Sequence, residues 1–219
     1  MKSTILGLLF AAGVANAAST ITFSSTTLFA TNFQNGSGAT NTTMAWGILV
    51  DSTGNGFKDG EYVDGFTIAK GSGTNAGAPV LLSTSTGVTD DYLIMSGNLM
   101  NLTTSTVDGA TVGINRITNL TSFSYPSGVA GGDAFKIIWF DQTQIATSTV
   151  AAAGLQYGTF QTATLNTLPA DPTATISYAS AFTGADASKV MSFSVQAVPE
   201  PSAALLGMLG ALGLLRRRR

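Results

Sequence analysis

The sequence predicts an all-β fold, an antiparallel β-sandwich or jelly roll, with an N-terminal signal peptide and one C-terminal hydrophobic helix. Three observations favour the β domain: short apolar runs rich in Val, Ile, Thr, Phe and Tyr, turn clusters of Gly, Asn, Asp and Ser between them, and no long run with a helical hydrophobic period. Many short strands at this spacing are typical of two packed antiparallel sheets. We expect a signal peptide at 1–17, a β-sandwich domain at 18–197 and a C-terminal segment at 198–219.

The first 17 residues have the three parts of a secretory signal peptide. Lys2 supplies the positive charge, residues 5–14 form the apolar run, and Ala15-Asn16-Ala17 is a small-residue cleavage box. We therefore expect export through the Sec translocon and cleavage between Ala17 and Ala18. An uncleaved N-terminal anchor is the alternative reading of the same residues.

The β domain contains ten runs that we expect to be strands, because they are rich in β-branched and aromatic residues and several alternate apolar with polar positions. The runs at 44–50 and 135–140 are the most hydrophobic and should be central strands. The ten predicted strands lie at residues 19–24, 44–50, 62–69, 80–83, 92–96, 117–125, 135–140, 157–165, 174–178 and 190–197.

Each of the two most hydrophobic runs carries one tryptophan. Trp46 and Trp139 could offer an indole face on which a sugar ring stacks. An isolated tryptophan inside an apolar strand is more often part of the core. Both interpretations stay open at this point.

Residues 51–61 form the densest local cluster of oxygen-bearing side chains. Asp51 and Asn55 fall at positions 1 and 5 of an EF-hand loop, but Thr53 and Tyr62 stand at positions 3 and 12, where acidic ligands are usual. An EF-hand is therefore not expected. Either a looser calcium-stabilised β-loop or a hairpin connection without metal fits the pattern. The candidate calcium ligands are Asp51, Asn55, Asp59 and Glu61.

The chain has no Cys and no His, which removes Ser-His and Cys-His nucleophile pairs and the usual zinc and copper ligands. Asp90 and Asp91 are adjacent, so on a strand they should point to opposite faces rather than form an acid–base pair. Glu61 is the only Glu apart from Glu200, which is meagre for a glycosidase. We assign no catalytic residue and no cofactor other than a candidate calcium ion, and we do not expect an enzyme.

The charge of the β domain speaks against nucleic-acid binding. Residues 18–198 carry five basic and eleven acidic side chains, a net charge of −6. Five scattered cations provide no patch that could neutralise phosphates. We expect no nucleic-acid partner.

The C-terminal segment combines a proline-bounded linker, an apolar run and a positive cluster. Pro199-Glu200-Pro201 cannot lie inside a regular element. Residues 203–215 contain only Ala, Leu, Gly and Met, which predicts a helix of about 20 Å, short for a membrane span. Arg216, Arg217, Arg218 and Arg219 should stay on the cytoplasmic side.

This order of parts resembles the PEP-CTERM sorting signal of Gram-negative bacteria. The resemblance rests on Pro199-Glu200-Pro201, the apolar run and the arginine cluster, and the stretch from Trp46 to Phe57 is also similar to domains of such proteins. It implies that a membrane-embedded, exosortase-type enzyme cuts near the tripeptide and releases the protein to the cell surface or an exopolysaccharide matrix. It implies no activity for the β domain.

The sequence as a whole predicts an exported, non-enzymatic protein of the cell surface or extracellular matrix, held in the membrane by its C-terminal helix and then cleaved. One alternative is a carbohydrate-binding module for an extracellular polysaccharide. Another is a permanently membrane-anchored surface protein, in which the helix at 203–215 is retained.

Overall fold

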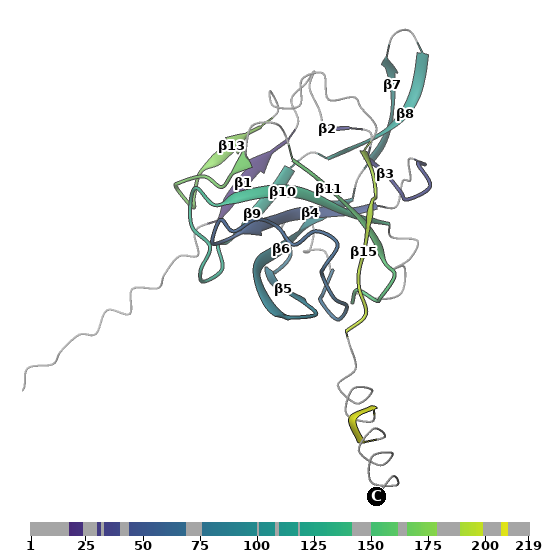
Figure 1. Cartoon of the computed structure of the whole chain (residues 1–219). Helices are drawn as coiled ribbons and strands as arrows, with labels where there is room; N and C mark the ends of the chain where they lie inside the picture. The colour runs from purple at the N-terminus through teal and green to yellow at the C-terminus, as the bar shows by residue number, and fades with distance from the viewer. Residues whose placement is uncertain are drawn as a thin grey trace, which may run out of the picture.

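The computed structural model describes residues 18–23, 30–31, 33–39, 44–68, 76–99, 101–107, 110–117, 119–141, 150–161, 166–178, 189–198 and 207–209. Within these ranges the regular structure is almost entirely β-strand, and most strand pairs are antiparallel. The predicted all-β class is therefore confirmed. The main sheet is curled rather than flat (Figure 1).

The largest sheet has seven strands and places β4 and β10 at its centre. Its order is β15-β11-β10-β4-β6-β5, and β12 adds a short pairing to β10. All of its pairs are antiparallel. Its strands are β4 (Met44–Asp51), β5 (Val80–Thr84), β6 (Gly87–Leu99), β10 (Ala134–Asp141), β11 (Gln156–Phe160), β12 (Asn166–Thr167) and β15 (Phe193–Ser194).

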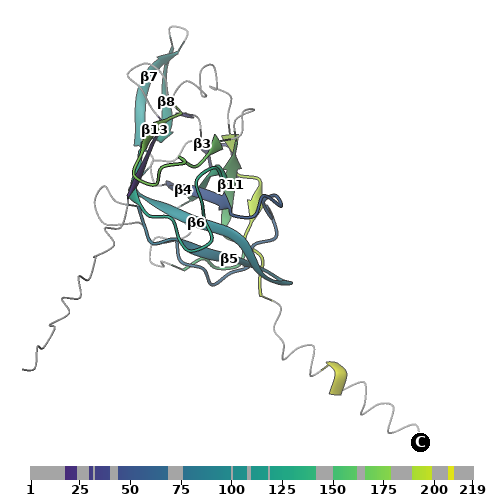
Figure 2. The same cartoon turned by 90° about the vertical axis from the view of Figure 1, so that its left-hand side faces the viewer.

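Three smaller sheets complete the described structure. One has the order β13-β1-β9, one pairs β14 with β3, and one has the order β2-β8-β7. The pairs β1–β13 and β14–β3 are parallel. The β7–β8 hairpin projects away from the rest of the chain in both views (Figures 1 and 2). The strands are β1 (Ser19–Thr22), β2 (Ala30–Thr31), β3 (Phe33–Gln34), β7 (Asn101–Val107), β8 (Ala110–Ile117), β9 (Asn119–Phe123), β13 (Thr175–Ser177) and β14 (Lys189–Val190).

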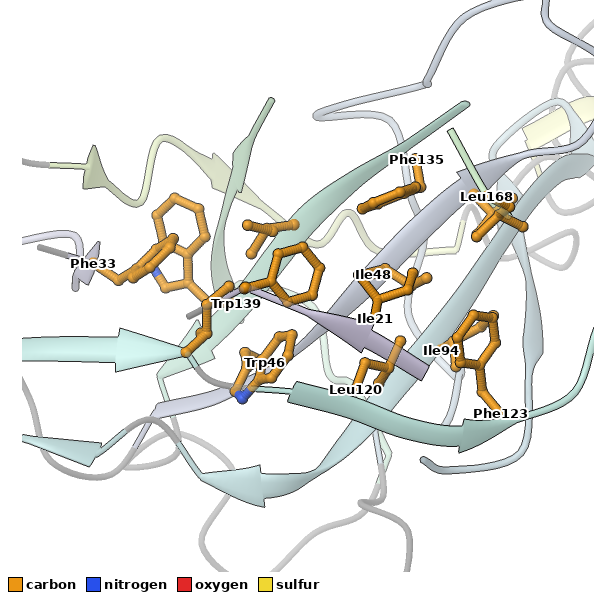
Figure 3. Packing of buried hydrophobic residues seen from close by; sticks show 14 of the residues in the cluster. Ile21, Phe33, Trp46, Ile48, Ile94, Leu120, Phe123, Phe135, Trp139 and Leu168 are labelled. Atoms are coloured by element: carbon orange, nitrogen blue, oxygen red, sulfur yellow. The ribbon is translucent and has the colours of Figure 1, made fainter. Parts of the chain in front are cut away.

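The central strands bury side chains on both faces of the main sheet, which explains why their sequences are continuous apolar runs. On one face, side chains of β4 and β10 meet the small sheet that contains β1 and β9 (Figure 3). On the other face they meet the segments around residues 62–68, 82, 151–155 and 195. All eight residues of β4 are buried. The two clusters are thus separated only by the sheet itself.

Both tryptophans lie inside the first of these clusters. Trp46 is 0% exposed and Trp139 is 1% exposed. Trp46 packs edge-on against Phe23 at a centroid distance of 5.6 Å, and Trp139 against Phe33 at 4.9 Å. Trp139 also donates its indole N–H to the Gln34 carbonyl at 3.0 Å. Neither indole has a free face, so the sugar-stacking hypothesis for these two residues is wrong.

Several predicted strands are shorter or broken. Within the predicted strand at 62–69, the described residues 62–68 form only isolated bridges at Tyr62, Val63 and Thr67, because Gly65 has a φ of +96° that an extended strand does not allow. The predicted strand at 190–197 is divided into β14 and β15. The β7–β8 hairpin was not predicted at all.

The sequence elements proposed for export and sorting lie mostly outside the described residues. These are Ala15, Ala17, the tripeptide at 199–201 and the arginines at 216–219, while Ala18 is described and exposed. Within the predicted apolar helix, residues 207–209 are described and helical. No helix among the described residues is long and apolar enough to cross a membrane.

Gly47 lies where the register between β4 and β6 shifts. A substitution there tests how closely the backbones of these two strands approach each other. A Cβ added there would clash with the Ile94 carbonyl oxygen and lie 2.9 Å from the Met95 Cα, both backbone atoms that cannot move independently. We expect Gly47→Ala to lower the free energy of unfolding by about 1–3 kcal/mol in urea denaturation. Gly36→Ala is the matched control, because its new Cβ meets only the flexible end of the Gln156 side chain. Equal costs for the two variants would contradict the close β4–β6 approach.

Candidate functional site at an acidic loop

The loop that follows β4, residues 51–61, is organised by the carboxylate of Asp51. Its Oδ1 accepts the backbone N–H groups of Thr53 at 3.2 Å and Gly54 at 2.7 Å, and its Oδ2 accepts that of Gly56 at 2.8 Å. Asp is suited to this role because its short side chain reaches the backbone two or three residues ahead. Gly54 and Gly56 have φ values of +73° and +94°, which other residues rarely adopt. The chain therefore curls back toward the end of β4.

Strand β6 brings two further carboxylates to this loop. Asp91 is the direct cross-strand partner of Asp51. Asp90 accepts the Thr53 hydroxyl and, at 3.0 Å, the Asn55 side-chain amide. One carboxylate oxygen from each of Asp51, Asp90 and Asp91 lies within 4.8 Å of the others. We call these three residues the aspartate cluster.

The expectation that Asp90 and Asp91 point away from each other is wrong. Between the pairs Leu81–Tyr92 and Ser83–Val88, β5 advances two residues while β6 advances four. The extra residues of β6 form a β-bulge that includes both aspartates. A bulge breaks the strict alternation of side chains, so neighbours in sequence can converge on one site.

Asp91 is the most enclosed member of the cluster, with 0% exposure. Its Oδ2 accepts the Tyr62 hydroxyl at 2.6 Å and the Lys58 backbone N–H at 3.1 Å. Its Oδ1 is buried, and no donor from the described part of the chain reaches it. Burial raises the pKa of Asp91 above its ordinary value, and the two hydrogen bonds only partly offset this.

Asp90 lies closer to solvent and behaves differently. Its slight burial favours a higher pKa, but the hydrogen bonds from Thr53 and Asn55 outweigh this and lower the pKa of Asp90 below its ordinary value. The hydrogen bonds thus favour the charged form of Asp90, whereas burial disfavours the charged form of the neighbouring Asp91.

Asp59 and Glu61, two of the four predicted calcium ligands, are not members of the aspartate cluster. Asp59 forms an ion pair with Lys136 of β10 and accepts the Thr159 hydroxyl at 3.2 Å. Lys136 is itself buried and lies 4.0 Å from the centre of the Phe57 ring. Burial lowers the pKa of Lys136, against the opposing effect of Asp59. Of the four predicted ligands, Asp51 alone belongs to the aspartate cluster, and Asn55 contacts it through Asp90.

Glu61 instead lines a shallow hollow of about 390 Å³ next to the aspartate cluster. The hollow runs between the acidic loop and the β5–β6 hairpin. None of its lining residues is aromatic, so it lacks the flat apolar platform on which sugars stack. It is lined by Thr53, Asn55, Lys58, Glu61, Thr84, Thr86, Val88, Thr89 and Asp90.

Comparison of the chain with protein-family models, with curated proteins and with solved structures found no match. What is inferred about its function therefore rests on the residues and contacts described above.

The buried ion pair between Lys136 and Asp59 predicts a strong and asymmetric mutational response. Lys136→Met should lower the free energy of unfolding by about 3–5 kcal/mol, because it leaves the Asp59 carboxylate without its cation. The double variant Lys136→Met/Asp59→Asn should recover most of this loss, since no unpaired charge remains. Urea unfolding of the two variants and the parent measures both effects. A double variant as unstable as Lys136→Met would contradict the pairing.

Two buried tyrosines predict a loss of stability at high pH. Burial raises the pKa of Tyr62 and of Tyr157, and the Asp91 carboxylate next to the Tyr62 hydroxyl adds to its shift. Above about pH 10 the unfolded chain releases these protons while the folded chain keeps them, so each tyrosine lowers the free energy of unfolding by up to about 1.4 kcal/mol per pH unit.

Urea unfolding between pH 9 and 11 measures this slope. Tyr62→Phe should reduce the slope, because it removes one of the groups whose pKa differs between the folded and unfolded chain. An unchanged slope would show that Tyr62 titrates normally in the folded protein.

Proposed function

We propose that this chain is an exported, non-enzymatic protein of the cell surface or extracellular matrix, sorted through its C-terminal segment and cut near Pro199-Glu200-Pro201. The observation that carries the proposal is the order of parts in residues 199–219: the tripeptide, the apolar run and the arginine cluster. The Sec translocon and an exosortase-type enzyme are the partners that this order implies. The finished protein would lie on the outer surface or in a polysaccharide matrix.

The way in which the β domain ends supports cleavage at this position. Gln196 exchanges backbone hydrogen bonds with Tyr62 and Asp64, at 2.8 and 2.9 Å. Val198 donates its N–H to the Asp64 carboxylate at 2.9 Å. Among the described residues, these last contacts of the β domain precede Pro199, so a cut within 199–201 would leave them intact.

A domain that functions outside the cell without disulfides needs a substantial core. The chain contains no Cys. We propose that the main sheet and the β13-β1-β9 sheet are the two layers of a β-sandwich, because side chains of both meet in one buried cluster (Figure 3). Such a core supports a stable export product without cross-links.

A carbohydrate-binding role is the weaker alternative. Trp46 and Trp139 are buried and cannot stack on a sugar. The hollow beside the aspartate cluster is lined by polar groups and has no aromatic side chain. Permanent anchoring through residues 203–215 is a second alternative, which the experiment below separates from release.

The intact mass of the protein recovered from the cell surface and medium of the cells that make it tests the proposal. We expect a chain that begins at Ala18 and ends within or next to residues 199–201. Glu200→Ala should remain in the membrane fraction at its uncut length, while Glu61→Ala, which changes an exposed Glu elsewhere, should be released like the parent. Recovery of chains that retain Arg219 would overturn processing and support the permanent anchor.

A further inference from the structure

The aspartate cluster concentrates negative charge, and among the described residues no cation forms an ion pair with it; Lys136, which pairs with Asp59, acts on Asp51 and Asp91 only at longer range. Asp51 and Asp91 face each other directly across β4 and β6, an arrangement that is destabilising for like charges. The donors that reach the three carboxylates are backbone N–H groups and the neutral side chains of Thr53, Asn55 and Tyr62. No ion pair reaches the cluster among the described residues. Some other positive charge would stabilise this arrangement.

A second, independent observation points to a ligand. Asp91 Oδ1 is a fully buried carboxylate oxygen that has no hydrogen-bond partner among the described residues. Buried acceptors of this kind are rare and costly. Asp59 also has a buried oxygen without a donor, but its carboxylate is neutralised by Lys136. Asp91 forms no ion pair with any described residue, and Lys136 acts on it only at longer range.

The cluster has acceptor sites to spare for a cation. A carboxylate offers about four lone-pair sites, and the structure gives three donors to Asp51, two to Asp90 and two to Asp91. About five sites are left on the three carboxylates, and one oxygen of each carboxylate lies within 4.8 Å of the other two. The Thr53 hydroxyl and the Asn55 amide, which contact Asp90, place two more oxygens at the edge of the cluster.

We propose that Asp51, Asp90 and Asp91 bind a calcium ion that fastens the acidic loop to β6. The ligands are all oxygen, and the chain has no Cys or His, which favours a hard cation. Calcium accepts six to eight oxygens in irregular geometry, whereas magnesium demands a near-ideal octahedron. An irregular cluster built from a bulge and a loop suits calcium. This site differs from an EF-hand, because two of its three carboxylates come from a distant strand.

Calcium chloride added to the full chain, purified in mild detergent and stripped with a chelator, tests this site. Calorimetric titration should show one calcium ion per chain. At a hundredfold excess over Kd, calcium should raise Tm by roughly 5–10 °C. No heat and no change in Tm would overturn the proposal, and a stronger effect of magnesium chloride would overturn the assignment to calcium.

Variants locate the ion. Asp90→Asn and Asp91→Asn should each weaken calcium binding at least about tenfold, because each removes a charged ligand. Asp171→Asn is the control: Asp171 is an exposed Asp whose Oδ1 accepts the Thr173 N–H at 2.8 Å, and it should bind calcium as the parent does. Should Asp91→Asn not fold, Asp90→Asn decides, since Asp90 is only half-buried.

Two results with these variants would overturn the site. The first is binding by both cluster variants at the affinity of the parent, which would place the ion elsewhere. The second is an Asp91→Asn variant whose Tm rises with calcium as much as that of the parent, which would mean that Asp91 does not bind the ion.

Discussion

The antiparallel pairing of β4 with β10 is the constraint on which the rest of the structure depends. The two strands match residue for residue from Met44–Asp141 to Asp51–Ala134. Their side chains fill a buried cluster on each face of the sheet. A shift in the register of this pairing would displace the side chains of both hydrophobic clusters. The register is therefore fixed, and with it the residue at which β4 ends. Asp51 is that end, so the position of the acidic loop is set by the core.

The aspartate cluster is a consequence of the same ladder on its other side. β6 pairs with β4 and so brings Asp91 opposite Asp51, while the bulge against β5 turns Asp90 toward the same place. Polar groups are thus assembled at the point where a rigid sheet meets an irregular loop. Tyr62 contacts the aspartate cluster as well. Its ring packs in the second buried hydrophobic cluster, and its hydroxyl donates a hydrogen bond to Asp91. Such amphipathic placement is a common use of a buried tyrosine.

The sequence was a good guide where one strand alone determines the outcome. The apolar runs at 44–50 and 135–140 are too continuous for a sheet with one wet face, and both are central strands. It was a poor guide where two distant segments decide. The bulge of β6 exists only relative to β5, and the partner of Asp59 is Lys136, 77 residues away. The β7–β8 hairpin was missed because β7 is rich in Thr and Ser and lacks apolar alternation, while the short alternation of Ala110, Val112 and Ile114 in β8 was overlooked.

The exit of the chain from the β domain has a mechanical consequence. Tension applied through residue 199 would first load the Val198–Asp64 hydrogen bond and the two backbone bonds of Gln196, rather than peel β15 from its neighbour. These bonds join the exit to residues 62–64, directly after the acidic loop. The bridge between Val63 and Gln196 is parallel, so a pull along the chain would load its hydrogen bonds together rather than one at a time. Under such a pull, these bonds would break before β15 loses its pairing with β11.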